Sequence, residues 1–163
     1  MELVDLLNDR KEKTGEVCAR NNVPEGKYRL SIHIWIVNDE NKLLIQQRSS
    51  NRKMFPNKWT NTGGACVSGE ESLDTVYREL KEELDVIPVK ENLEFIASYK
   101  RKNDFVDVWV LRQNLNIEEL KLQTDEVQAV RWVEIKEWEK LVEEGEGIKS
   151  STDYFLKYFN NDF

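Results

Sequence analysis

The stretch that begins at Gly64 and ends at Leu84 constrains the fold of this chain more than any other. A glycine turn is followed by a segment with helical periodicity, from about Glu70 to Leu84. Three glutamates stand in this helix at positions i, i+3 and i+4, namely Glu79, Glu82 and Glu83. That spacing places their side chains on one face of the helix. Like charges so placed destabilise an isolated helix by roughly 0.2–0.5 kcal/mol per pair, and a bound cation reverses the sign of that effect.

The ligand type on this face indicates which cation could bind. Oxygen ligands suit hard cations, and Mg²⁺ in proteins typically uses one or two carboxylates together with substrate phosphates. The helix therefore predicts a site for Mg²⁺ (or Mn²⁺) that serves phosphate chemistry. A solvated acidic face is the alternative, because the chain carries 31 acidic residues against 24 basic ones. The spacing alone leaves both interpretations open.

The wider pattern around the helix narrows that choice. Residues 64–86 resemble the box of the MutT-like Nudix hydrolase superfamily, G-x5-E-x7-R-E-U-x-E-E-x-G-U, in which U is an aliphatic residue. The departure from the pattern is Asp85, which stands where the box has its second glycine. Asp tolerates the left-handed conformation of a helix end at a cost of roughly 1 kcal/mol. The positions that match are Gly64, Glu70, Arg78, Glu79, Leu80, Glu82, Glu83 and Val86.

The resemblance implies a role for each residue of the box that carries chemistry. Glu79, Glu82 and Glu83 correspond to the metal-binding glutamates, and the backbone carbonyl of Gly64 corresponds to a further ligand. Arg78 corresponds to the arginine that orients one of the glutamates, and Glu82 is its partner at i, i+4. An arginine fork can hold a carboxylate in one rotamer. The alternative for Arg78 is an ordinary surface ion pair, worth about 0–1 kcal/mol.

The reaction that the resemblance implies is the hydrolysis of a nucleoside diphosphate linked to another moiety, X. Metal ions neutralise the diphosphate and lower the pKa of a bound water. A nearby carboxylate can then remove the proton from that water. Glu83 is the first candidate for this general base, and Glu126, in a polar turn before a predicted strand, is the second. The motif does not decide between them.

Arg48, which precedes the box, and Glu70, which belongs to it, are candidates for contact with the substrate. Arg48 ends a predicted strand, where it either meets the diphosphate or lies on the surface. Glu70 stands at the start of the helix, where it either reaches the metal through water or stabilises the helix dipole by roughly 0.3–1 kcal/mol. Phe55 and Trp59 either flank a pocket or belong to the core. His33 is expected to be structural.

A second resemblance concerns residues 55–62, FPNKWTNT. This segment is similar to the stretch before the active-site cysteine of type I isopentenyl-diphosphate isomerases, which share the Nudix fold. When the segments are aligned on Trp59, the position of that cysteine falls on Gly64, and a nearby histidine ligand falls on Cys66. The only histidine, His33, cannot supply the histidine-rich metal site of the isomerases. Hydrolysis is therefore favoured. An isomerase-like enzyme and a domain that senses a nucleotide without turnover are the alternatives.

Composition limits the partners of the chain. Its 163 residues, 39% of them hydrophobic, fit one domain over 1–163 with a sizeable core. The net charge of −7 argues against binding to a nucleic-acid polymer. It is compatible with a small-molecule diphosphate, because metal ions can supply positive charge. The sequence contains neither an apolar run of about 18 residues nor a signal-peptide pattern. We therefore expect no membrane span and a cytoplasmic location.

Hydrophobic periodicity predicts a mixed α/β chain. An N-terminal β-hairpin occupies residues from about 2 to 20, and the central helix lies between two groups of strands. Together with the late helices, this order predicts an α/β/α sandwich with a mixed β-sheet, and the Nudix resemblance implies the same fold. Ligand specificity is expected in loops 49–58 and 100–105, and a homodimer through the hairpin or the late helices is left open. The remaining expected elements are strands at 28–37, 42–48, 59–62, 93–101, 105–113 and 127–133, and helices at 135–144 and 151–159.

Overall fold

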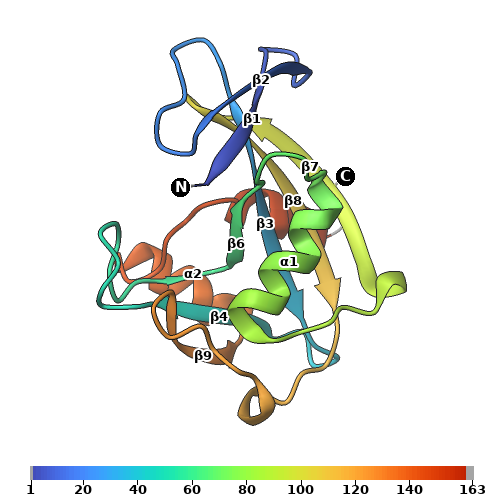
Figure 1. The fold of residues 1–163 in the computed structure, drawn as a ribbon. Coiled ribbons are helices and arrows are strands. Elements are labelled where there is room, and N and C mark those ends of the chain that lie inside the picture. The colour runs from blue at the N-terminus through green and yellow to red at the C-terminus, as the bar shows by residue number, and fades with distance from the viewer. Residues whose placement is uncertain (1, 161–163) are drawn as a thin grey trace.

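The computed structural model describes residues 2–160, and a mixed β-sheet lies at its centre (Figure 1). Seven strands form this sheet in the described part of the chain, in the order β5-β4-β3-β8-β7, with β6 beside β3 and β9 beside β4. β3 and β8 are parallel, whereas the other pairs are antiparallel. The strands are β3 (Arg29–Val37), β4 (Leu43–Arg48), β5 (Trp59–Thr60), β6 (Thr62–Ala65), β7 (Leu93–Lys100), β8 (Asp104–Arg112) and β9 (Val127–Val133).

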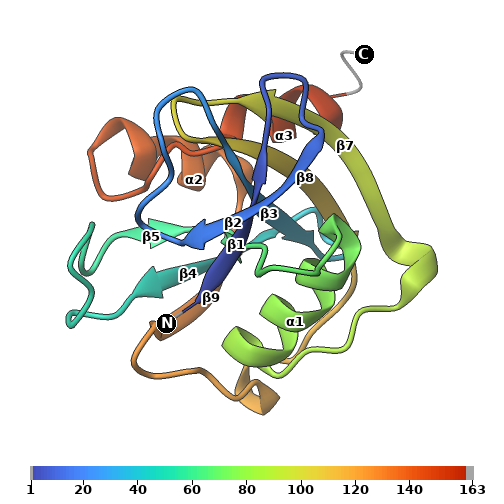
Figure 2. The same ribbon diagram turned by 45° about the horizontal axis from the view of Figure 1, so that its top comes forward.

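Helices cover both faces of the sheet, so the predicted α/β/α sandwich is confirmed. Helix α1 (Ser72–Leu84) lies in front of the sheet in Figure 1, and α2 (Ile135–Glu143) and α3 (Thr152–Phe159) lie behind it, as the turned view in Figure 2 also shows. Alternation along β3 supplies both cores. Its even-numbered isoleucines pack with the apolar side of α1, and Trp35 and Val37 pack with α2 and α3. No helix within residues 2–160 is long and apolar enough to cross a membrane.

The N-terminal residues form a separate hairpin of β1 (Leu3–Leu7) and β2 (Lys13–Ala19), which lies at one end of the large sheet (Figure 1). Its turn is attached to that sheet, because Lys11 Nζ lies 2.7 Å from the buried carboxylate of Asp107. Leu7 also forms a β-bridge with Tyr28, just before β3. The turn of the hairpin therefore lies next to the start of β3. The predicted single domain runs over 1–163, of which residues 1 and 161–163 lie outside the described residues.

The edge of β3 is divided between two strands. β4 pairs with β3 only at Ile36 and Val37, and β6 pairs with it from Ser31 to Ile34. Beyond this point β4 pairs instead with β9 and β5. Two strands that share one edge in this way must diverge. Side chains of β3, β4, β6 and α1 line a common cavity in the region of that divergence.

Helix α1 begins later than the sequence predicts. Serine commonly caps helices, but the Ser68 hydroxyl donates instead to Asp5 of the hairpin at 2.6 Å. Glu71 is the N-cap, and its backbone N–H donates to Asp74 at 2.9 Å. At the other end Asp85 is left-handed, with φ 58° and ψ 43°, as expected for the position where the box has a glycine. The late helices start and end within one residue of their predicted limits.

Candidate active site

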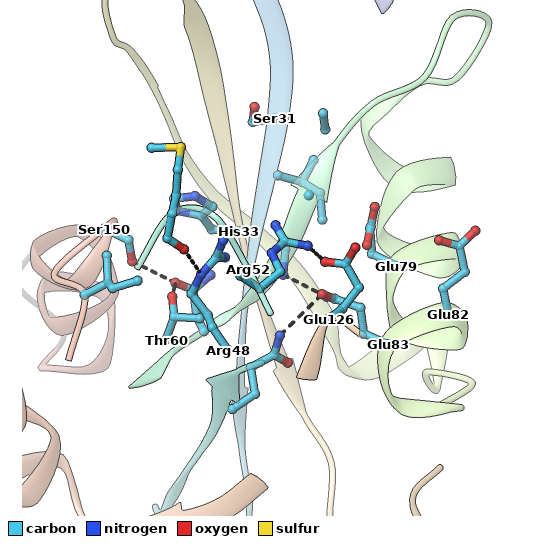
Figure 3. Close-up of a pocket in the computed structure, with 18 of the residues that line it drawn as sticks. Ser31, His33, Arg48, Arg52, Thr60, Glu79, Glu82, Glu83, Glu126 and Ser150 are labelled. Atoms are coloured by element: carbon cyan, nitrogen blue, oxygen red, sulfur yellow. Dashed lines mark hydrogen bonds and ion pairs between the residues drawn. The ribbon is translucent and has the colours of Figure 1, made fainter. Parts of the chain in front are cut away.

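A cavity of about 390 Å³ brings the glutamates of α1 together with residues from several other elements. Figure 3 shows Glu79, Glu82 and Glu83 projecting from the helix on one side of it. The floor includes Gly63 and Gly64 of β6. Arg48 and Arg52 lie on the side away from α1, and the carboxylate of Glu126 lies between Arg52 and the helix (Figure 3). Residues that are far apart in the sequence thus meet where β4 and β6 diverge.

Glu83 is the most deeply placed of the glutamates. It is buried, and its carboxylate accepts long hydrogen bonds, both 3.4 Å, from the Gln46 side chain and the backbone N–H of Gly63. Burial, followed by repulsion from Glu79, raises the pKa of Glu83. Burial also raises the pKa of Glu79, although Arg78 opposes this effect. Ionising both groups therefore costs free energy, which a nearby cation would offset.

Gly64 makes room for the carboxylate of Glu79. A Cβ atom built on Gly64 would lie 2.3 Å from Glu79 Oε1, which is far inside contact distance. The reason for glycine at this position is therefore space. Gly63 meets a different neighbour, because its Cβ would lie 2.4 Å from the backbone oxygen of Ile32. The two glycines thus let α1 and β3 both approach β6 closely.

Arg78 connects the residues of the box through more contacts than the sequence predicts. Its predicted i, i+4 contact is present, with Nη1 3.2 Å from Glu82 Oε2. The same nitrogen lies 2.9 Å from Glu79, and Nη2 donates to the backbone oxygen of Ala65 at 2.9 Å. Nε and Nη2 donate to both oxygens of Glu70, at 2.7 and 3.0 Å. The hydrogen bonds with Glu70 raise the pKa of Arg78, so it stays charged.

Glu70 lies behind Arg78 and is not among the residues that line the cavity. Its Oε1 accepts hydrogen bonds from the Val67 backbone N–H at 3.0 Å and from the Thr75 hydroxyl at 2.9 Å. Burial alone would raise its pKa, but the hydrogen bonds from Arg78, Val67 and Thr75 outweigh burial and lower it. Glu70 is therefore an ionised anchor for Arg78 and for the turn before α1. A contact between Glu70 and the substrate stays a prediction.

The candidates outside the box lie on the opposite wall. Glu126 lines the cavity and forms an ion pair with Arg52. Arg48 also lines it and donates from Nε to the backbone oxygen of Met54 at 2.9 Å. Phe55 belongs to the lining, whereas Trp59 does not and instead packs its ring 4.8 Å from the Arg131 guanidinium.

Besides Arg52, which lies in the loop 49–58 expected to carry specificity, sequence reasoning missed three arginines that line the cavity. They are Arg20 just after β2, Arg29 at the start of β3, and Arg101 after β7. No local pattern marks them, because each comes from a different element. The tertiary fold alone brings them to one place.

The glutamates do not form a closed metal site as they stand. Within residues 2–160, no three His, Cys, Asp or Glu side chains converge on one point as metal ligands would. Arg78 serves as the counter-ion of Glu79 and Glu82, and the Glu82 side chain is 48% exposed. Arg78 contacts one oxygen of each carboxylate, Glu79 Oε1 and Glu82 Oε2, so the second oxygen of each could bind a cation.

Cys66 and His33 have the properties of structural residues. The Cys66 thiol is buried, accepts a hydrogen bond from Thr75 at 2.8 Å, and has its pKa raised by burial to about 12. It is therefore uncharged at neutral pH, whereas a nucleophilic cysteine is a thiolate. Burial lowers the pKa of His33 to about 4, and its Nδ1 lies 2.9 Å from Ser151 Oγ. Neither residue carries charge near pH 7.

Comparisons with known proteins give matches in both sequence and fold. The family model described as the NUDIX domain matches residues 27–153. An uncharacterized Nudix hydrolase of Listeria innocua is 35% identical over 150 residues, which cover 91% of this chain and 89% of that protein. A protein from Deinococcus radiodurans of known crystal structure has a TM-score of 0.80 at 23% identity, over 96% of this chain and 98% of the other. An isopentenyl-diphosphate delta-isomerase of Salmonella typhi is 27% identical, over 69% of this chain and 66% of that protein.

The matches include the parts of the chain that build the candidate site. The family model spans the paired glycines of β6 and all of α1. The likeness to the Deinococcus radiodurans structure extends over 96% of this chain. On this sequence match and this fold, the chain belongs to the Nudix hydrolase family.

Proposed function

We propose that this protein is a metal-dependent hydrolase that cleaves the diphosphate bond of a nucleoside diphosphate linked to another moiety, X. One observation carries the proposal. Glu79 and Glu83 have small exposed fractions, face the same cavity, and have their pKa values raised by burial and by repulsion between carboxylates. Strongly shifted carboxylates in a cleft are typical of functional sites.

The donor set fits Mg²⁺ or Mn²⁺. Glu79, Glu82 and Glu83, with the backbone carbonyl of Gly64, would supply oxygen ligands only, which is the preference of these ions. The space that Gly64 leaves beside Glu79 supports this assignment, because a side chain there would displace the carboxylate. When bound, the ion would neutralise the diphosphate and make its bound water more acidic.

The residues of the chain would divide the remaining tasks. Arg78 would hold Glu79 and Glu82 near the cavity wall through the ion pairs described above. Glu83 is our first choice for the general base, because its raised pKa brings proton transfer closer to neutral pH. Glu126 is the second choice, and its use as a base requires the ion pair with Arg52 to open. Arg48 and Arg52 would contact the diphosphate.

The isomerase alternative has less support than hydrolysis. Gly64 and Cys66 occupy the positions where the isomerases have their cysteine and a histidine ligand. Burial raises the pKa of the Cys66 thiol to about 12, so it is a poor replacement for a nucleophile or an acid at neutral pH. A domain that senses a nucleotide without turnover remains the other alternative, because affinity and catalysis use the same carboxylates.

Turnover with added Mg²⁺ or Mn²⁺ tests the proposal. We would incubate the protein with nucleoside diphosphate sugars, ADP-ribose, dinucleotides, nucleoside triphosphates and isopentenyl diphosphate, and identify products by mass spectrometry. Glu82→Gln should abolish metal-dependent cleavage with the fold intact by circular dichroism. Glu139→Gln, an exposed change on α2, is the matched control. Normal turnover by Glu82→Gln would refute the metal assignment. Tight binding without turnover would favour the sensor.

A further inference from the structure

The positive charges in the cavity are all of one residue type. Six of the nine arginines of the chain line it, whereas none of the fifteen lysines, all within the described residues, does. The two side chains carry the same charge, so charge alone does not explain this choice. Arginine differs in offering a planar fork of N–H donors that fits phosphate and carboxylate groups in a bidentate manner. The arginines that line the cavity thus indicate that it binds phosphate or carboxylate groups.

The six arginines fall into three groups with different surroundings. Arg78 is engaged by the glutamates of the box, and Arg48 and Arg52 lie on the wall opposite α1. Arg20, Arg29 and Arg101 form the third group, which we call the arginine end. They are close neighbours, because Arg29 Nη1 donates to the backbone oxygen of Arg20 at 2.8 Å. Burial, followed by the charge of Arg20, lowers the pKa of Arg29. The Asp104 carboxylate opposes this effect, and Arg101 adds to it.

The guanidinium groups of the arginine end have more N–H donors than they use in hydrogen bonds. A guanidinium has five N–H donors. Arg101 uses two of its nitrogens on Asp104, at 2.6 and 2.8 Å. Arg20 reaches Glu2 at 3.3 Å, but both side chains are largely exposed, so this pair is weak. Among residues 2–160, no carboxylate lies within ion-pairing distance of Arg29. Two carboxylates thus lie within ion-pairing distance of three guanidinium groups, and an anion could bind the N–H donors that remain.

The arginine end is separated from the glutamates by strand β6. Along β3, Arg29, Ser31 and His33 alternate with Ile32, whose side chain belongs to the core beneath α1. The first three side chains therefore leave β3 on the face away from α1, and all three line the cavity. A Cβ on Gly63 would lie 3.4 Å from His33 Cδ2 and one on Gly64 would meet Glu79, so the glycines lie between the two regions.

We infer that the arginine end binds a second anionic group of the substrate, a phosphate or a carboxylate that lies outside the scissile diphosphate. This inference rests on the proposed function, and it narrows the substrate class to nucleoside diphosphate compounds that carry an additional negative group. A diphosphate held at the glutamates would leave the rest of the ligand to extend past β6, toward Arg29.

Two matched pairs of substrates test the inference and separate the two kinds of anion. ADP-ribose and its 2′-phosphate differ only by a phosphate, and UDP-glucose and UDP-glucuronate differ by a carboxylate. We expect kcat/KM to be at least about tenfold higher for the charged member of one pair, the size of one good charge-assisted contact. Arg29→Gln and Arg20→Gln should reduce that ratio toward one, mainly through KM, and leave the neutral member unchanged. Arg10→Gln, on the exposed hairpin turn, should keep the ratio.

Arg29→Gln and Arg20→Gln differ in the structural contacts that they remove. Arg29→Gln loses the bond to the Arg20 backbone, whereas Arg20→Gln keeps it. The inference is therefore tested by Arg20→Gln even if the Arg29 variant is unfolded. An unchanged ratio in folded variants, or equal loss on charged and neutral substrates, would overturn it.

A second measurement separates failure of the inference from failure of the proposed function. In EDTA, binding of inorganic phosphate by isothermal titration calorimetry requires neither metal nor turnover. We expect Arg20→Gln and Arg29→Gln to weaken it about tenfold, and Glu82→Gln to leave it intact or strengthen it. If the wild type binds phosphate in this way but cleaves no compound of the wider panel, the proposed function fails while anion binding at the arginine end stands. If it cleaves them and the arginine variants bind phosphate normally, only the inference fails.

Discussion

At the scale of single residues, the absence of a side chain at Gly64 determines where the Glu79 carboxylate can lie. The Cβ of an alanine at position 64 would displace the flexible end of the Glu79 side chain, whereas at position 63 it would collide with the backbone of Ile32. The first change should therefore harm the site and the second should harm the fold.

We accordingly predict different outcomes for two alanine variants. Gly64→Ala should lower kcat/KM by about a hundredfold, the cost of displacing a catalytic group by roughly 1 Å, and should change stability little. Gly63→Ala should destabilise the protein by about 1–3 kcal/mol through overpacking. Urea denaturation and steady-state kinetics on both variants provide the check. Full activity of Gly64→Ala would mean that the position of Glu79 is unimportant.

Cys66 leads to a second prediction at this scale. Cys66→Ala should remain active, because a buried thiol with a pKa of about 12 takes no part in hydrolysis. A stability loss of about 1 kcal/mol is expected, since the variant loses the hydrogen bond from Thr75. Product formation measured beside thermal melting tests both statements. Complete loss of turnover by a folded Cys66→Ala protein would revive the cysteine-based isomerase.

The sequence predicted those site residues and contacts that lie close together along the chain. Helical spacing placed the glutamates of α1 on one face and paired Arg78 with Glu82, as the structure has them. The same reasoning gave Arg78 one partner instead of its full set, because Glu70 and the Ala65 carbonyl reach it through the turn before the helix. The arginine end was missed altogether, because β2, β3 and the end of β7 meet only in the folded chain.

At the scale of elements, the C-terminal end of α1 shows a departure from the family pattern. Asp85 adopts the left-handed conformation that glycine takes most easily, and its side chain forms an ion pair with Lys81 on the surface. The conformation costs Asp roughly 1 kcal/mol, whereas an exposed ion pair of this kind contributes little to stability. The residue therefore affects stability and is remote from the chemistry.

We predict that Asp85→Gly raises the free energy of unfolding by up to about 1 kcal/mol and leaves kcat unchanged. Asp85→Asn is the matched control, because it keeps the tolerance of left-handed backbone and removes only the charge. Chemical denaturation of the three proteins measures the difference. A Gly variant less stable than wild type would show that the contact with Lys81 outweighs the cost of the left-handed backbone at Asp85.

Element boundaries were predictable to the extent that local signals decide them. Strand β9 and the late helices follow directly from hydrophobic periodicity and agree with the structure within one residue. The start of α1 was misplaced because Ser68, a good local cap, is bonded to Asp5 of the hairpin. The division of one β3 edge between β4 and β6 leaves no local signal either, although it helps to form the cavity.

At the scale of the whole molecule, the buried glutamates couple stability to pH and to metal. In the unfolded chain they ionise near 4.5, whereas in the folded protein burial raises the pKa values of Glu79 and Glu83. Above pH 4.5 the unfolded state therefore binds fewer protons than the folded state. Stability from this source is present at acidic pH and is lost as the pH rises through the folded values.

A bound divalent cation should remove this penalty. We predict that Mg²⁺ or Mn²⁺ raises the melting temperature more at mildly alkaline than at mildly acidic pH, relative to protein in EDTA. Glu83→Gln should show a smaller pH dependence in EDTA, because one buried charge is gone. Differential scanning calorimetry at the two pH values gives the comparison. A metal-induced shift that is equal at both would argue against binding at these glutamates.

The central claim is that the carboxylates of α1 support hydrolysis of a diphosphate bond, and its most direct test follows oxygen from water into product. The protein would be incubated with the substrate panel and Mg²⁺ or Mn²⁺ in ¹⁸O-labelled water, with Glu82→Gln in parallel. The account predicts cleavage with one labelled oxygen in a phosphate product, and none with the variant. Isomerised isopentenyl diphosphate without label, or equal cleavage by Glu82→Gln, would contradict it.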